Sequence, residues 1–181
     1  MKDKYYYSDG TTSSDIDLYK ILHRKDGPAF ERADGDRFWY LNGNLYREDG
    51  PAVEYADGYK EWYQNGRIHR EDGPAIEYSN GNKEWRRHGV LHREDGPAIE
   101  FSDGHAAWYI NGELHREDGP ALEGADGFKK WHLNGKRINT LSKKQLIKYM
   151  KANNFTVAHL FTDSDEVVRT SAAKYKWKKI V

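Results

Sequence analysis

One stretch of this sequence decides the fold: Ile68-His69-Arg70-Glu71-Asp72-Gly73-Pro74-Ala75-Ile76-Glu77-Tyr78-Ser79-Asn80-Gly81-Asn82-Lys83-Glu84-Trp85. Its Asp-Gly-Pro-Ala quartet recurs every 23 residues, beginning at Asp26, Asp49, Asp72, Asp95 and Asp118. Tryptophan keeps the same spacing, at Trp39, Trp62, Trp85, Trp108 and Trp131. A fixed period of this size indicates a repeat architecture. We therefore predict five repeats within residues 22–140, numbered units 1 to 5: Leu22–Asn44, Leu45–Arg67, Ile68–Val90, Leu91–Glu113 and Leu114–Lys136.

The composition favours strands and turns over a thick globular core. Of the 181 residues, 14% are aromatic and 17 are glycine, whereas only 37% are hydrophobic. Aromatic side chains bury a large area per residue, and disordered chains are poor in them. The chain has no cysteine, which excludes a disulfide framework and a cysteine-ligated zinc site. No apolar stretch has the length of a signal-peptide core or a membrane span, so we expect a cytoplasmic protein.

The charge is distributed unevenly along the chain. Lysine and arginine together number 29, and aspartate and glutamate also number 29. Residues 141–181 hold nine of the basic and three of the acidic residues, a net charge of +6, so the other 140 residues carry 20 against 26, or −6. The sequence thus describes an acidic array with a basic tail. The overall balance argues against a purely electrostatic DNA-binding protein.

Two kinds of turn divide each unit. The first is Asn-Gly, as at Asn65-Gly66, with His88-Gly89 in its place in unit 3. Asn-Gly favours a two-residue type I′ hairpin loop, which places Tyr63 opposite Ile68, Trp62 opposite His69 and Glu61 opposite Arg70. The second is Asp57-Gly58 and its equivalents. A three-residue loop there pairs Glu54 with Lys60, whereas a two-residue loop pairs Glu54 with Glu61, which charge repulsion disfavours. We predict the first register.

These turns predict a mainly β fold: an elongated single antiparallel sheet of stacked β-hairpins. The tryptophans and the apolar position before each glutamate are the expected buried spine, the latter being Phe30, Val53, Ile76, Ile99 and Leu122. Residues 1–21 read as a degenerate cap repeat, because Tyr7-Ser8-Asp9-Gly10 resembles Tyr55-Ala56-Asp57-Gly58 and Ser14 falls where tryptophan would.

Residues 141–181 predict a basic helical cap. Ser142 begins a capping box, and Leu146, Ile147 and Met150 lie on one helix face until Asn153-Asn154 ends it. A second helix is expected to start near Ser164 or Asp165. We expect this tail to cover the open strand edge of unit 5, because exposed edges invite unwanted pairing.

The repeats resemble MORN-type repeats, which also run near 23 residues and carry an aromatic-rich hairpin, an Asp-Gly turn and a tryptophan followed by Asn-Gly. The resemblance covers Leu22 to about Asn139. Two features depart from the MORN pattern: Trp62 lies four residues before Gly66 rather than three, and Asp-Gly-Pro-Ala replaces Gly-x-Gly. The His-Arg-Glu-Asp-Gly-Pro-Ala variant is similar to uncharacterised proteins of tailed bacteriophages and bacteria. The resemblance implies a non-catalytic scaffold for protein contacts, and membrane binding has been proposed for some MORN proteins.

Recurring histidines and carboxylates raise metal-binding and catalytic alternatives. Four histidines share one frame, His23, His69, His92 and His115, with Tyr46 in unit 2. Equivalent residues of neighbouring units should lie ~10–14 Å apart in a stacked sheet, too far to share one zinc ion, so we expect them to stack on tryptophan. The carboxylates repeat with cross-strand partners, whereas an active site is singular. We expect no enzyme activity, metal or cofactor.

We expect the function to lie where the units differ, because the shared residues are what the scaffold needs. One varying column is Arg32, Tyr55, Tyr78, Phe101 and Gly124, and a second is Asp36, Tyr59, Asn82, His105 and Phe128. The predicted register places these columns side by side, forming an aromatic strip that positive charge interrupts. Tyrosine and arginine are enriched at binding surfaces. The predicted partner-binding residues are Tyr55, Tyr59, Tyr63, Tyr78, Arg86, Arg87, His88, Phe101, His105 and Tyr109.

The expected partner is a protein. Together with the resemblance to phage repeats, a long aromatic face suggests an inhibitor that covers a bacterial host protein, for example one used in defence, in the host cytoplasm. A nucleotide or nucleic-acid partner is the alternative, with tyrosines stacking on bases and basic residues holding phosphates. A structural scaffold is a third hypothesis. The strip would instead be structural if it packs against the helical tail or a second copy in a homodimer.

Overall fold

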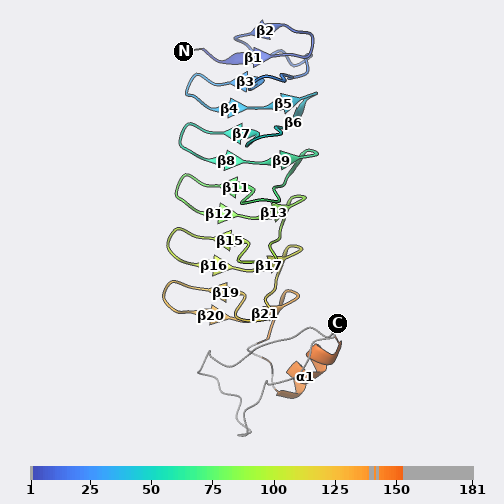
Figure 1. Ribbon diagram of the computed structural model, residues 1–181, viewed down its shortest axis with the longest axis vertical. Coiled ribbons are helices and arrows are strands. Elements are labelled where there is room, and N and C mark those ends of the chain that lie inside the picture. The colour runs from blue at the N-terminus through green and yellow to red at the C-terminus, as the bar shows by residue number, and fades with distance from the viewer. Residues whose placement is uncertain (1, 139–140, 142, 153–181) are drawn as a thin grey trace.

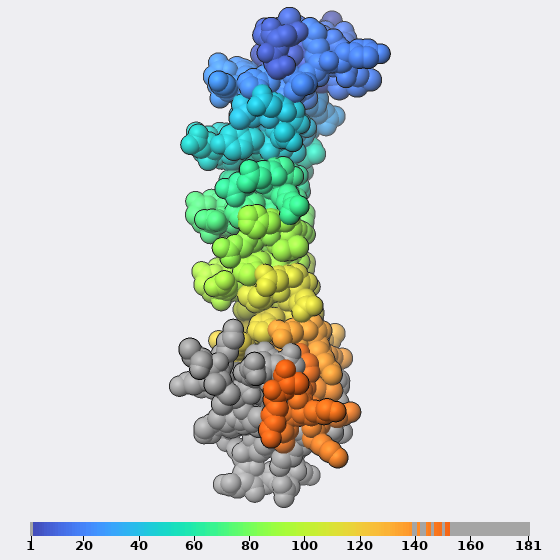
Figure 2. Space-filling view, turned by 90° about the vertical axis from the view of Figure 1, so that its right-hand side faces the viewer, coloured from blue at the N-terminus to red at the C-terminus, as the bar shows by residue number. Residues whose placement is uncertain are grey.

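The computed structural model describes residues 2–138, 141 and 143–152. It is an elongated stack of antiparallel hairpins that runs from the N-terminal to the C-terminal unit (Figures 1 and 2). The mainly β prediction is confirmed. The predicted second helix and the Ser142 cap lie outside the described residues.

Units 1 to 5 each contribute two short strands to a main sheet, and the N-terminal hairpin adds two more (Figure 1). Each unit also forms a lateral hairpin, whose second strand runs across the end of the unit. The twelve strands of the main sheet are β1 (Lys4–Tyr6), β2 (Thr12–Ser13), β3 (Phe30–Glu31), β4 (Arg37–Phe38), β7 (Val53–Glu54), β8 (Lys60–Glu61), β11 (Ile76–Glu77), β12 (Lys83–Glu84), β15 (Ile99–Glu100), β16 (Ala106–Ala107), β19 (Leu122–Glu123) and β20 (Lys129–Lys130). The lateral hairpins are β5 (Tyr40–Leu41) with β6 (Asn44–Leu45), β9 (Tyr63–Gln64) with β10 (Arg67–Ile68), β13 (Arg86–Arg87) with β14 (Val90–Leu91), β17 (Tyr109–Ile110) with β18 (Glu113–Leu114), and β21 (His132–Leu133) with β22 (Lys136–Arg137).

Both predicted turn registers are confirmed. Glu54 pairs with Lys60 across the Asp-Gly turn, and Tyr63 pairs with Ile68 across the lateral hairpin. Asn65 and Gly66 have φ of 51° and 70°, the positive values that a type I′ turn requires. The expected pairing of Glu61 with Arg70 is wrong. Glu61 stays in the main sheet between Val53 and Ile76, while the Arg70 N–H donates to the Arg86 carbonyl of the next lateral hairpin.

The pairing gives the main sheet two different faces, because side chains alternate along a strand. We call one the tryptophan face. It carries the five tryptophans, the alanines of Asp-Gly-Pro-Ala, which have no exposed surface, and a row of alternating charges in which Glu77 lies between Lys60 and Lys83. The opposite row includes Val53, Glu61, Ile76 and Glu84. The predicted single spine is therefore corrected: tryptophan and the Val53 column lie on opposite faces.

The arginine of each His-Arg-Glu-Asp motif joins successive hairpins on the tryptophan face. The Arg70 guanidinium lies 4.2 Å from the centre of the Trp62 ring. Its Nε donates to Asp72 at 2.8 Å, and its Nη1 donates to the Pro74 carbonyl at 3.4 Å. Nη1 also lies 3.7 Å from Glu77. The same arrangement recurs at Arg47, Arg93 and Arg116.

This arginine also explains the glycine of Asp-Gly-Pro-Ala. A Cβ at Gly73 would lie 2.9 Å from Cζ of Arg70, closer than carbon atoms normally approach. Any larger residue there would displace the guanidinium from its position over Trp62. The repeated Arg-Glu-Asp-Gly-Pro-Ala sequence is therefore one packing unit.

The recurring histidines bind the turn of the next lateral hairpin. Nδ1 of His92 accepts the Asn111 backbone N–H at 3.2 Å, and His115 accepts that of Asn134 at 3.1 Å. In unit 3, His69 accepts the N–H of His88 at 3.1 Å, and the two rings contact each other at a tilt of 30°, with centroids 4.5 Å apart. The expected histidine–tryptophan stacking is replaced by arginine on tryptophan.

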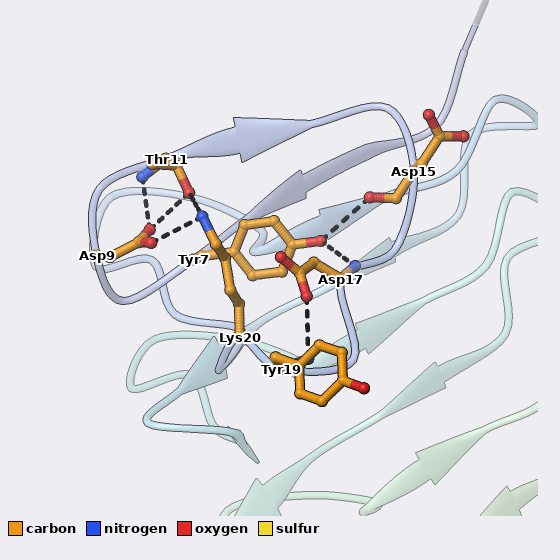
Figure 3. A network of polar contacts seen from close by, with 7 residues as sticks. All are labelled: Tyr7, Asp9, Thr11, Asp15, Asp17, Tyr19 and Lys20. Atoms are coloured by element: carbon orange, nitrogen blue, oxygen red, sulfur yellow. Dashed lines mark hydrogen bonds and ion pairs between the residues drawn. The ribbon is translucent and has the colours of Figure 1, made fainter.

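The N-terminal hairpin has the predicted Asp-Gly turn but is inverted in the sheet. Strand β1, not β2, pairs with β3, so the order is β2-β1-β3. Tyr6 therefore takes the place of tryptophan beneath Arg24, at 4.1 Å, while Ser14 does not. Figure 3 shows how the connection back to unit 1 is held: Lys20 pairs with Asp9 at 2.8 Å, and the Tyr7 hydroxyl accepts the Asp17 N–H at 2.8 Å.

The single described helix, α1 (Lys143–Ala152), lies at the C-terminal end of the stack, as predicted (Figures 1 and 2). Its Tyr149 hydroxyl donates to the Leu133 carbonyl, and Lys136 lies over the Tyr149 ring at 4.9 Å. The helix therefore contacts the last lateral hairpin, β21–β22. Leu133 in that hairpin is fully buried.

Candidate functional site

The face opposite the tryptophans varies most between units, and we call it the tyrosine face. Along its middle run Phe38, Val53, Glu61, Ile76 and Glu84, each paired with its neighbour across the strands. Two flanking columns follow by strand alternation. One flanks the Asp-Gly turns, with Tyr55, Tyr59, Tyr78, Phe101 and His105, and the other lies on the first strand of each lateral hairpin, with Tyr40, Tyr63, Arg86 and Tyr109.

The aromatic rings on the N-terminal half of this face form a continuous series. Successive ring centroids lie 4.5 Å apart for Tyr5–Phe30, 5.2 Å for Phe30–Phe38, 5.7 Å for Phe38–Tyr55, 5.3 Å for Tyr55–Tyr59 and 5.4 Å for Tyr59–Tyr78. The predicted neighbourhood of Tyr55 and Tyr59 is confirmed. Tyr5, Phe30 and Phe38 were not among the residues predicted for this face. The signal that could have found them is the strand register, which places Phe38 opposite Val53, Phe30 opposite Phe38 and Tyr5 opposite Phe30.

Two carboxylates lie in the middle of the tyrosine face. Glu61 accepts hydrogen bonds from the Tyr59 hydroxyl and, at 2.9 Å, from the Tyr63 hydroxyl. Glu84 accepts one from the Tyr78 hydroxyl at 2.9 Å. Sequence reasoning did not single out these glutamates. The position that Glu61 and Glu84 share also varies between units, as the predicted binding positions do. This variation was the sequence signal that could have identified the two glutamates.

The tyrosines around these glutamates are donors at neutral pH. Burial and the hydrogen bond to Glu61 raise the pKa values of Tyr59 and Tyr63 well above the ordinary value for tyrosine. Burial and the bond to Glu84 raise the pKa of Tyr78 to about 12. Their hydroxyl groups therefore stay protonated and hold the carboxylates in place.

The three basic residues predicted at the centre of the strip are separated in the structure. Nε of Arg86 donates to Glu84 at 2.7 Å, so Arg86 lies on the tyrosine face. The next residue, Arg87, points to the other face by strand alternation, and its guanidinium lies 4.0 Å from Glu94. His88 is a turn residue with φ of 51°, and its ring contacts that of His69. Only Arg86 of the three joins the tyrosines.

The C-terminal part of the face is less continuous. Phe101 and His105 contact each other edge to face, with centroids 6.4 Å apart, and His105 also bonds Asp103 at 2.9 Å. Tyr109 lies on β17, where it pairs with Leu114. The ten predicted residues thus divide into a compact tyrosine group around Glu61 and Glu84, a separate Phe101–His105 pair, Tyr109, and two residues that lie off the face.

Within residues 2–138, 141 and 143–152, no three histidine, cysteine or acidic side chains are placed to hold one metal ion. Over the same residues, no helix is both long and apolar enough to cross a membrane. No protein-family model and no curated protein sequence matches this chain. Its resemblance to MORN-type repeats therefore stays a prediction from the sequence.

Proposed function

We propose that this chain is a non-catalytic binding module that holds a protein partner on its tyrosine face. The observation that carries this proposal is the continuous series of rings from Tyr5 to Tyr78, on the face where the units differ. Tyrosine supplies a large contact area at a low cost in conformational entropy, and it is enriched in the residues that dominate binding energy.

The face offers both apolar and polar contacts. Tyr55 is 38% exposed, and Phe101 is 40% exposed, so their rings are available to a partner. The hydroxyls of Tyr59, Tyr63 and Tyr78 are fixed by glutamates, which restricts the ring orientations before binding. A surface with restricted side chains loses less entropy on association.

The charges favour a protein over a nucleic acid as the partner. A nucleic-acid surface needs positive groups free to contact phosphates. Arg86 is instead bonded to Glu84, and Glu61 adds a negative charge to the same face. The more specific hypothesis, a bacterial host protein inhibited by being covered, rests on the resemblance to phage repeats.

The proposal is tested by capture from a bacterial lysate, with and without nuclease, followed by affinity measurements on the recovered partner. Single variants Tyr55→Ala, Tyr78→Ala and Arg86→Ala are compared with Tyr46→Ala. Tyr46 is the matched control, because it is as exposed as Tyr55, at 38%, and lies opposite Trp39 on the other face.

At least one face variant should weaken binding by ~2 kcal/mol or more, while Tyr46→Ala leaves it unchanged and circular dichroism shows an intact fold. Recovery of nucleic acid alone would contradict a protein partner. Binding that survives all three face variants and is lost when residues 141–181 are removed would move the site to the tail.

A further inference from the structure

Units 2 and 3 carry the same carboxylate in two different surroundings. Glu61 and Glu84 occupy the same position of the repeat, and both accept a tyrosine hydroxyl. In unit 3 the second oxygen of Glu84 receives a guanidinium from the same chain, because Arg86 follows two residues later. In unit 2 the residue at that position is Tyr63.

Glu61 therefore has hydroxyl partners but no cation from its own chain. In the part of the chain that the structure describes, no lysine, arginine or histidine nitrogen lies within 4.0 Å of its carboxylate, whereas Arg86 lies 2.7 Å from Glu84. The neighbouring Lys60 points to the opposite face, where it pairs with Glu54 and Glu77. A carboxylate can accept about four hydrogen bonds, and tyrosines donate two to Glu61.

The rings around Glu61 suit a flat cation. Tyr59 lies between Tyr55 and Tyr78 in the ring series, and its hydroxyl reaches Glu61. Guanidinium groups are attracted to aromatic rings as well as to carboxylates. The chain already uses this combination on its other face, where Arg70 lies over Trp62 and pairs with Asp72.

We propose that Glu61 and its tyrosines receive a basic side chain of the partner, with arginine preferred, which binds through the acceptor positions of the carboxylate that Tyr59 and Tyr63 leave free. This inference deepens the proposed function and rests on it, since it names the chemistry that the partner presents to the tyrosine face. A partner arginine would complete in unit 2 the carboxylate–tyrosine–guanidinium contact that unit 3 makes internally. The charge of Glu61 thereby selects for a partner with a basic surface.

The first test uses the full chain and the capped tripeptide Gly-Arg-Gly, followed by two-dimensional NMR of the tyrosine rings. Gly-citrulline-Gly is the neutral control peptide, because citrulline has nearly the shape of arginine without its charge. Glu61→Gln should weaken arginine-peptide binding about tenfold, since hydrogen bonds between charged groups are the strong ones. Glu77→Gln removes the same charge from the opposite face, where Glu77 pairs with Lys60 and Lys83, and should leave binding unchanged.

A second variant, Tyr63→Arg, gives unit 2 the residue that unit 3 has. It should fold, because the same residue pair exists one unit away, and it should abolish tripeptide binding by occupying Glu61 from within the chain. Equal weakening by Glu61→Gln and Glu77→Gln, or equal binding of the citrulline peptide, would overturn the inference.

Failure of this inference is distinguishable from failure of the proposed function. If a captured protein partner loses binding to Tyr55→Ala but binds Glu61→Gln like the unmodified chain, the protein-binding face stands and the basic-group preference is wrong. If the partner binds every tyrosine-face variant normally, the proposed function itself is wrong, and this inference falls with it.

Discussion

The two faces of the main sheet follow different rules. On the tryptophan face, the same arginine, tryptophan, glycine and alanine recur from unit to unit, and each arginine makes the same contacts as Arg70. On the tyrosine face, by contrast, a single position of the repeat holds Tyr63 in unit 2, Arg86 in unit 3 and Tyr109 in unit 4. Contacts that join hairpins must recur wherever two hairpins meet. The difference teaches that the repeated motif encodes stacking, whereas the positions outside it are free to encode recognition.

The largest expected difference between the faces is in stability. Trp62→Ala should lower the free energy of unfolding by about 3 kcal/mol, because it removes a large ring together with the surface on which Arg70 packs. Tyr55→Ala, on the tyrosine face, should cost less than about 1 kcal/mol, because the side chain is partly exposed. Urea unfolding measures both stability losses. It is followed by far-ultraviolet circular dichroism rather than by tryptophan fluorescence, which the Trp62 substitution itself changes. Similar losses would mean that the faces share the stabilising role.

A smaller effect is expected at Gly73. Gly73→Ala should destabilise the fold by about 1–2 kcal/mol, because the added methyl group displaces the Arg70 guanidinium. In an Arg70→Ala background the same substitution should cost much less, since nothing remains to be displaced. A double-mutant cycle in urea measures this coupling. Additive losses would show that Gly73 is required for another reason.

On the tryptophan face, we also expect the free energy of unfolding to depend on pH through His69. Burial, followed by the nearby His88, lowers the pKa of His69 below its ordinary value of 6.5. The unfolded chain therefore binds the proton first, so the stabilisation is complete above pH 6.5 and is lost as the pH falls through the folded pKa. The protonated ring can no longer accept the His88 N–H, a loss of about 1 kcal/mol.

Urea unfolding between pH 5 and 8 measures this effect. The control is His69→Tyr, because unit 2 has Tyr46 at this position, and it should flatten the part of the pH profile that His69 causes. An unchanged slope in this variant would assign the pH dependence to another group.

The smallest expected effect is a gain. Glu100 and Glu123 flank Ala106 in the charged row of the tryptophan face, where the other units place lysine or arginine. Ala106→Lys should stabilise the chain by about 0.5 kcal/mol at low salt, and the gain should fade as salt is added. Thermal unfolding at two salt concentrations tests it. A gain that persists at high salt would point to packing rather than charge.

Much of the fold could be predicted because its signals are local. Asn65-Gly66 specifies its own turn through backbone preference, and the charges of Glu54, Lys60 and Glu61 select one register over another within eight residues. The helix Lys143–Ala152 follows from its own spacing of apolar residues. Tyr55, Tyr59 and Tyr78 could be grouped for the same reason, since the register determines the columns.

The amino-acid sequence by itself determined the period, the two turns and the columns that vary, because each depends on residues close together in the chain. Tertiary structure decided which groups meet between hairpins. It placed Arg70 over Trp62 rather than beside Glu61. It inverted the N-terminal hairpin, so that Tyr6 takes the place of tryptophan. It also surrounded Glu61 with tyrosine hydroxyls, whereas Glu84 bonds Arg86. These outcomes depend on how strands bend and stack, and contacts across such distances leave no mark in the spacing of a single unit.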